Sequence, residues 1–283
     1  MVDLFGFGHE ITSDLPIPGT LPSCDSLSEQ APQLSIVLAP PARIPSSPIY
    51  RIDNDALMFN PPGVGQYRCL SDRIEVTPET GGDGQALVDL LIATALPAVQ
   101  WLRGHFVLHA AGVVLPGSSA VIAICGLSGS GKSTLAAALL LRGASLLGDD
   151  SLRLASTPAG WTAAGLPGGL FEISPAGGER SFRPAGPGRM VGEARLDAIF
   201  VLGERGSEFA IERFDRISAV GQLLAMRHRP RIPELVGRSA QVLEQATGLA
   251  TALPLFGWQR VTGEAALGDQ EFAMLLQCCG QPG

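Results

Sequence analysis

The sequence predicts an α/β protein whose core contains a mixed sheet, and three consecutive segments carry this prediction. Residues 120–125 form a short apolar run, typical of a buried strand, that ends in a glycine-rich loop. Residues 133–142 follow with an apolar helical pattern, and Gly143 stands where a helix C-terminus is capped. Residues 144–147 are again apolar and run directly into Asp149 and Asp150. Alternation of strands and helices in this order is typical of α/β proteins.

The other segments divide the chain into two predicted domains, residues 1–85 and residues 86–283. The first is expected to be an irregular leader at 1–48 with one strand at 34–38, then a small β-rich module with strands at 56–59, 66–70 and 73–76. The second begins with a helix at 86–103 that ends at Gly104. Further predicted elements are strands at 106–115, 196–202 and 209–214, a hairpin from 151–155 and 161–164, a loop region at 165–192, and helices at 216–227 and 234–248. The helix at 133–142 is apolar nearly all round, which predicts burial on both sides.

The composition argues against several classes of protein. With 46% hydrophobic and 17% charged residues, the chain has the make-up of an ordered protein. Its net charge of −7 argues against nucleic acid or an anionic membrane as partner. The apolar stretches are too short or too interrupted to span a bilayer, and the N-terminus shows no secretory signal. The five cysteines include no C-x-x-C pair, which favours a reduced, cytoplasmic location.

The loop after residue 125 satisfies the pattern G-x-x-x-x-G-K-[ST] of a phosphate-binding loop, the Walker A motif. In such a loop the glycines let backbone N–H groups turn toward phosphate, the lysine reaches the β- and γ-oxygens, and the hydroxyl ligates Mg²⁺. Lys132 is the only lysine in the chain, which argues against a chance match. The predicted nucleotide-binding residues are Gly126, Ser128, Gly129, Ser130, Gly131, Lys132, Ser133 and Thr134.

Asp149 and Asp150 end the strand expected at 144–147, beside this loop. At such a place one carboxylate can hold Mg²⁺ while its neighbour accepts the proton of an acceptor hydroxyl. A solvated turn is the alternative use of the pair. His109, 17 positions before Gly126, can either act beside the phosphate or be a hydrogen-bonded core histidine. His105 lies four positions earlier, but a strand does not place the two histidines together for zinc.

Two arginine-rich segments remain open between a functional and a structural interpretation. Residues 227–231 could supply an arginine to the triphosphate, or they could be a solvated helix end. Residues 177–192 could be a lid over the substrate or a passive loop. The arginines of this second segment are Arg180, Arg183 and Arg189.

From His109 to the aspartates the chain resembles the catalytic domain of HPr kinase/phosphorylase. The matching features are Leu108-His-Ala-Ala-Gly-Val113, the loop at 126–133, and residues 142–150, so that the resemblance covers about residues 105–165. The same core resembles phosphoenolpyruvate carboxykinase. The second signature of HPr kinases has no counterpart at 162–168. The β-rich N-terminal module is more similar to HPr-kinase-like proteins of peptide-modification systems, among them kinases that phosphorylate a serine of a lasso-peptide precursor.

The resemblance implies an HPr-kinase-like P-loop core that uses ATP and Mg²⁺. It makes Lys132 a phosphate ligand, Asp149 the general base, and Asp150 the metal ligand together with Ser133, and it places His109 beside the transferred phosphate. The implied reaction is transfer of the γ-phosphoryl group to a serine hydroxyl of a peptide or small protein, by a chain compatible with a homo-oligomer.

Two alternatives remain, a small-metabolite kinase and a nucleotide-switched regulatory ATPase. A GTP switch with an Asn/Thr-Lys-x-Asp guanine reader is excluded, because the only lysine lies in the loop.

Overall fold

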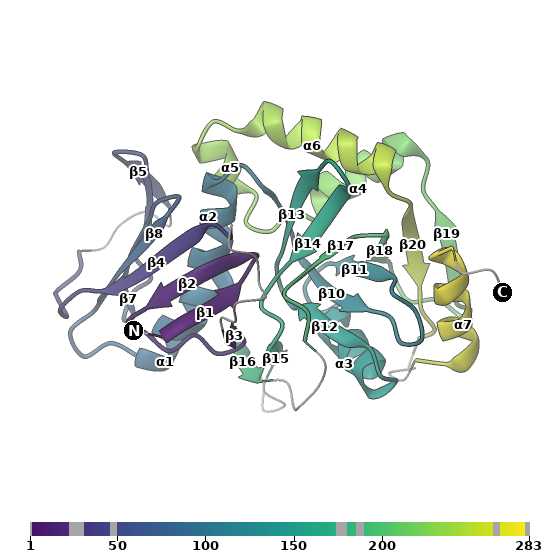
Figure 1. Ribbon diagram of the computed structural model, residues 1–283, viewed down its shortest axis with the longest axis horizontal. Coiled ribbons are helices and arrows are strands. Elements are labelled where there is room, and N and C mark those ends of the chain that lie inside the picture. The colour runs from purple at the N-terminus through teal and green to yellow at the C-terminus, as the bar shows by residue number, and fades with distance from the viewer. Residues whose placement is uncertain are drawn as a thin grey trace.

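The computed structural model describes residues 2–22, 31–45, 50–173, 180–184, 190–262 and 267–280. It is a mixed α/β structure with two large sheets (Figure 1). An N-terminal sheet lies at one end, and a six-stranded sheet, called the central sheet below, lies toward the other end. One continuous hydrophobic core runs from the N-terminal sheet to one face of the central sheet, and a second core fills the other face.

The N-terminal sheet has the strand order β3-β1-β2-β4-β8-β7-β6-β5. Its strands are β1 (Val2–Gly6), β2 (His9–Ser13), β3 (Leu21–Pro22), β4 (Gln33–Leu38), β5 (Arg51–Asp53), β6 (Ala56–Phe59), β7 (Gly65–Cys69) and β8 (Arg73–Pro78). The irregular leader expected at 1–48 is therefore wrong for β1 and β2, which form an antiparallel hairpin. The turn of this hairpin places Phe7 at a positive φ of 53°, a conformation that a bulky residue rarely adopts and that the sequence did not indicate.

The helix expected at 86–103 is confirmed, as α1 (Gly84–Leu90), a π-helical turn η1 (Leu91–Ala95) and α2 (Leu96–Leu102). The π turn directly precedes Pro97, which has no N–H to donate within the helix. The helix packs on the N-terminal sheet, where Tyr67 Oη donates to Leu87 O over 2.6 Å. In length and apolar composition it would pass for a membrane span, but 61% of that window is buried inside the protein, as in a core helix. The boundary predicted at 85/86 falls inside α1, which begins at Gly84.

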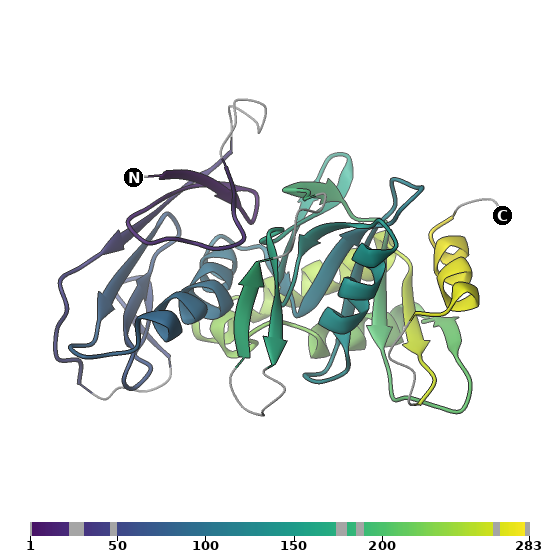
Figure 2. The same cartoon turned by 90° about the horizontal axis from the view of Figure 1, so that it is seen from below.

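The central sheet has the order β12-β10-β11-β18-β20-β19. Its strands are β10 (Ala110–Val114), β11 (Val121–Gly126), β12 (Ser145–Gly148), β18 (Ala198–Leu202), β19 (Ala210–Arg213) and β20 (Leu255–Gln259), of which β11, β18 and β20 are parallel neighbours. The helices α3 (Lys132–Leu141) and α7 (Asp269–Cys278) pack in the core on one face. The helices α4 (Arg216–Ala225) and α6 (Ser239–Ala252) belong to the core on the other face, and α5 (Arg231–Leu235) connects them (Figure 2).

The strand expected at 106–115 is split at His109 between two sheets. β9 (Phe106–Leu108) joins a four-stranded sheet of order β17-β14-β13-β9, whereas β10 enters the central sheet. The other members are β13 (Leu152–Thr157), β14 (Gly160–Ala164) and β17 (Glu193–Arg195), so the predicted hairpin is confirmed. Asp149 and Asp150 make the corresponding crossing, from β12 of the central sheet to β13. Both segments therefore change sheets at the same place.

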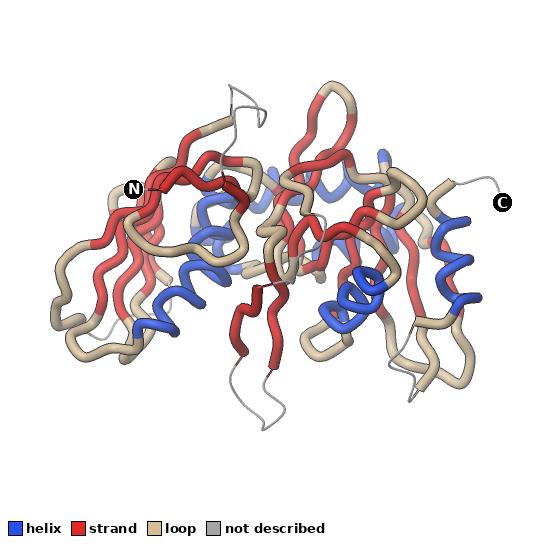
Figure 3. Tube along the Cα trace, turned by 60° about the horizontal axis from the view of Figure 1, so that its bottom comes forward, coloured by secondary structure: helices blue, strands red, loops and turns tan. Residues whose placement is uncertain are grey.

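Three further expectations need correction. The loop region at 165–192 contains the hairpin β15 (Gly169–Ile173) and β16 (Arg180–Pro184), which projects from the body (Figure 3). The proposed lid lies largely outside the described residues, as do the side chains of its arginines. The helix α3 is buried on one side only, because Leu135 and Leu139 are buried while Leu141 is 91% exposed. The strand β20 and the helix α7 were not predicted.

Candidate functional site

The phosphate-binding loop begins at the end of β11 and closes at the start of α3. Gly131, the N-cap of α3, has φ +95°, and Gly129 has φ +82°. This left-handed backbone is readily open only to glycine, and it turns successive N–H groups toward one side of the loop. Lys132 is 6% exposed, and its Nζ donates to Gly126 O over 2.8 Å and to Leu127 O over 3.1 Å. The ammonium group of Lys132 is therefore bound to the carbonyl oxygens at the start of the loop.

Ser133 and Asp149 meet beside this loop. Ser133 Oγ donates to Asp149 Oδ2 over 2.8 Å, and Phe171 N, from the hairpin β15–β16, donates to the same oxygen over 2.8 Å. The other oxygen, Asp149 Oδ1, is buried without a hydrogen-bond partner among the described residues. Burial raises the pKa of Asp149, against the lowering effect of the hydrogen bonds from Phe171 and Ser133. A nearby cation would favour the ionised carboxylate and satisfy Oδ1.

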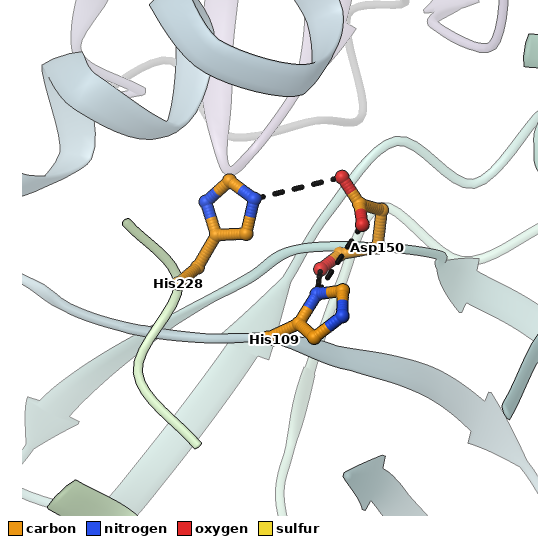
Figure 4. Close-up of side chains that lie close together, drawn as sticks. All are labelled: His109, Asp150 and His228. Carbon is orange, nitrogen blue, oxygen red and sulfur yellow. Dashed lines mark hydrogen bonds and ion pairs between the residues drawn. The ribbon is translucent and has the colours of Figure 1, made fainter. Parts of the chain in front are cut away.

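Asp150 and His109 form the second half of the site. His109 Nδ1 lies 2.8 Å from Asp150 O and 3.2 Å from Asp150 Oδ1 (Figure 4). A carbonyl oxygen can only accept, so Nδ1 carries the hydrogen and Nε2 of the neutral ring is left as an acceptor. The φ of Asp150 is +71°, a strained conformation of the kind that is held by its surroundings at functional sites. Asp150 is 1% exposed and the His109 side chain is 22% exposed, so His109 is the more accessible member of the pair.

A third member, His228, was not among the predicted site residues. Its Nε2 lies 3.6 Å from Asp150 Oδ2, on the side of the carboxylate away from His109 (Figure 4). The residue is 5% exposed, and burial lowers its pKa against the opposing effect of Asp150. His228 N donates to Val107 O and His109 N donates to Met226 O, so backbone pairing fixes both histidines at the junction of β9 and β10.

His228 could have been noticed as one of only four histidines in the chain, in the middle of the basic segment 227–231. Two of the arginines there have partners on neighbouring helices. Arg227 Nε donates to Leu224 O, and Arg229 Nη2 donates to Thr94 Oγ1 over 3.0 Å. The basic segment therefore contributes a histidine to this site, while Arg227 and Arg229 bind groups of α4 and η1.

An arginine does lie beside the phosphate-binding loop, from a part of the chain that the sequence did not single out. Arg205 follows β18, and its Nη2 is 3.6 Å from the position that a Cβ on Gly131 would take. Arg205 Nη1 also donates to Val261 O over 3.0 Å. Ser128 and Gly129 are exposed at the surface of the loop, and Thr134 is exposed in the first turn of α3.

No protein-family model matches the chain, and no curated protein matches it. Among solved structures it is similar to the HPr(Ser) kinase/phosphatase from Coxiella burnetii, with 14% identity over 61% of this chain and 87% of that chain and a TM-score of 0.31. A likeness of this extent does not show a function.

The residues present fit a nucleoside triphosphate with a divalent cation. The loop offers inward-turned amides, a buried ammonium and a helix N-terminus to the phosphates. Ser133 and Asp149 offer two hard oxygen donors, of the type that Mg²⁺ prefers, and a cation there would satisfy the buried Asp149 Oδ1, which has no hydrogen-bond partner among the described residues. His109, Asp150 and His228 also place one ligand atom each within 4.8 Å of one another.

Proposed function

We propose that the chain is an ATP- and Mg²⁺-dependent phosphotransferase that phosphorylates a serine hydroxyl of a peptide or small protein, for example a lasso-peptide precursor. The observation that carries the phosphotransferase part is the placement of two separate acidic sites side by side, Ser133–Asp149 next to the loop and His109–Asp150 beyond it. A protein that only senses a nucleotide needs the first site. A hydroxyl acceptor also needs the second, because its proton must leave.

At the nucleotide end, the loop amides and Lys132 bind the β- and γ-phosphates. Lys132 now donates to two loop carbonyls, and these are weaker partners than the charged oxygens of a phosphate. Ser133 and Asp149 would hold Mg²⁺, which supplies neutralisation of the charge on the transferred group. Arg205, beside Gly131, adds a further positive charge at the same loop.

At the acceptor end, His109 Nε2 accepts the proton of the attacking hydroxyl and the Asp150 carboxylate stabilises the imidazolium that forms. The hydroxyl oxygen bonds to the γ-phosphorus as the bond between this phosphorus and the β,γ-bridging oxygen breaks, and ADP leaves. This assignment moves the metal-binding role from Asp150 to Asp149, and it moves the base role from Asp149 to His109, which Asp150 supports. The reason is geometric, because Ser133 contacts Asp149, whereas the proton-accepting histidine contacts Asp150.

The test is an acceptor panel. The chain is incubated with MgATP and three kinds of candidate, serine-containing peptides, the same peptides with each serine replaced by alanine, and small hydroxylated metabolites. Mass spectrometry then locates the added phosphate. Phosphate on serine supports the proposal, phosphate on a metabolite assigns a small-metabolite kinase, and free phosphate with no modified acceptor assigns a regulatory ATPase.

A further inference from the structure

A pocket of about 280 Å³ lies on the central sheet next to the phosphate-binding loop. It extends from the residues after β18 over β20 and β19, and it is open at Gly203, which places no side chain there. A Cβ on Gly203 would meet no atom closer than 4.0 Å, and Phe214 closes the floor at Gly257, where a Cβ would lie 3.0 Å from its ring. The volume is at the small end for ligand pockets, which begin at about 300 Å³, and suits one planar ring system.

The strand register connects this pocket to the loop. Gly126, where the loop begins, pairs with Leu202 of β18, and Gly203 at the pocket is the next residue. Because β11, β18 and β20 are parallel, their carboxyl ends lie at one edge of the sheet, where ligands of open α/β sheets bind. Neighbouring strands are about 4.8 Å apart, so the pocket begins one strand from the loop. Arg205 follows Glu204, which lines the pocket, and its guanidinium lies beside Gly131 of the loop.

The charges of the lining select the part of a nucleotide that can enter. Glu204 and Glu212 line the pocket together with one cation, Arg213, and the amide of Gln259. Two carboxylates disfavour a triphosphate but accept hydrogen bonds from the hydroxyls of a ribose and from an amino group of a base. The loop therefore suits the anionic phosphates of a nucleotide, and the pocket suits its uncharged nucleoside. The two regions are complementary to the two ends of one nucleotide.

We infer that this pocket is the nucleoside subsite, in which the base lies over Gly203 and against the ring of Phe214 while the phosphates remain in the loop at 126–133. The inference rests on the proposed nucleotide binding and extends it to the residues that bind the base. On this inference, residues between Gly203 and Gln259 determine the affinity for the nucleoside, and the N-terminal module does not.

The test compares two magnesium complexes, those of ATP and of inorganic tripolyphosphate, which has the phosphates but no nucleoside. Calorimetric titration of the wild-type chain is expected to show ATP binding at least about 10-fold more tightly, or about 1.4 kcal/mol. Gly203→Leu fills the pocket without a backbone clash and is expected to remove that difference while leaving tripolyphosphate binding unchanged. Arg205→Ala is expected to weaken both ligands by the same factor.

Gly221→Leu is the matched control, because Gly221 is an exposed glycine of α4 whose Cβ would meet no atom within 4 Å. It is expected to bind both ligands like the wild type. Equal affinity of the wild-type chain for ATP and tripolyphosphate would overturn the nucleoside subsite and leave the loop intact as a phosphate site. A Gly203→Leu variant that retains the preference for ATP would also overturn it. Failure of the wild type to bind either ligand would instead contradict the proposed function.

Discussion

Ser133 Oγ donates a hydrogen bond to Asp149 Oδ2 over 2.8 Å, so the hydroxyl that ends the phosphate-binding loop and the first of the two aspartates act as one unit. Asp150, the next residue, turns away through a left-handed backbone conformation with φ +71° and contacts His109 and His228 instead. Two adjacent carboxylates are thereby assigned to different partners.

Lys132→Ala is expected to reduce phosphoryl transfer by at least about 100-fold, the usual cost of removing a group that stabilises charge developing in the transition state. Transfer of labelled γ-phosphate measures the loss. Arg68→Ala is the control, because Arg68 forms a partly exposed ion pair with Glu75 on the N-terminal sheet, and such pairs contribute little to stability. If Lys132→Ala retains wild-type turnover, the loop is not the phosphate site.

Asp149→Asn and Asp150→Asn are expected to fail in different ways. Asp149→Asn should raise the Mg²⁺ concentration needed for half-maximal activity by about 10-fold or more, because it removes a charged oxygen donor beside Ser133. Asp150→Asn should keep the Mg²⁺ requirement and lower kcat by about 100-fold, in the range for loss of acid–base assistance. Titrations of activity with Mg²⁺ separate the two effects. The reverse pattern would restore the assignment expected from the sequence.

His228 is expected to position Asp150 through its Nε2. His228→Leu removes the Nε2 that faces Asp150 Oδ2 at 3.6 Å and should lower kcat by about 10-fold or more while the KM for ATP stays unchanged, since His228 is held at the junction of β9 and β10 and not in the loop. His228→Gln places an amide nitrogen near the position of Nε2 and should recover most of the activity. If the Leu and Gln variants lose the same activity, packing and not the interaction with Asp150 explains the effect.

Stability is expected to fall in mild acid because of His9, a buried histidine of the N-terminal sheet. His9 Nε2 donates to Gln100 Oε1 over 2.7 Å, and Arg103 Nη1 donates to His9 Nδ1 over 2.8 Å. Burial, and secondly Arg103, lower its pKa to about 3, so the unfolded chain takes up this proton first. His9 therefore makes stability decrease as the pH falls below about 6.5, by up to about 1.4 kcal/mol per pH unit, until the folded pKa is reached.

Urea unfolding of the wild type and of His9→Gln at pH 7 and pH 5 measures this contribution. The variant cannot bind the proton and should lose less stability between the two pH values than the wild type. Equal losses in the two proteins would exclude His9 as the source.

The sequence predicts secondary structure best where an element depends on residues that are close together in the chain. The strand, loop and helix around Lys132 and the hairpin after Asp150 were predicted from local patterns, and the structure confirms them. It did not predict the hairpin of β1 and β2, whose turn depends on a positive φ at Phe7, nor β20, whose place in the sheet depends on pairing with β18.

The site residues that were missed depend on long-range contacts. His228 reaches Asp150 only because residues 226–228 pair with β9 and the start of β10, more than a hundred positions earlier. Arg205 reaches Gly131 only because β18 lies next to β11. The division of roles between Asp149 and Asp150 likewise depends on a single backbone conformation, for which neither aspartate gives a local signal.

The fate of the γ-phosphate tests the proposed phosphoryl transfer to serine most directly. The chain is incubated with Mg²⁺ and ATP labelled at the γ-position, with and without a serine-containing peptide pool, and ADP, free phosphate and peptide-bound phosphate are quantified. We expect ADP to form only when the peptides are present and Lys132 is intact. The amount of peptide-bound phosphate should equal the amount of ADP formed. ADP matched only by free phosphate, at a rate that the peptides do not change, would contradict the proposal.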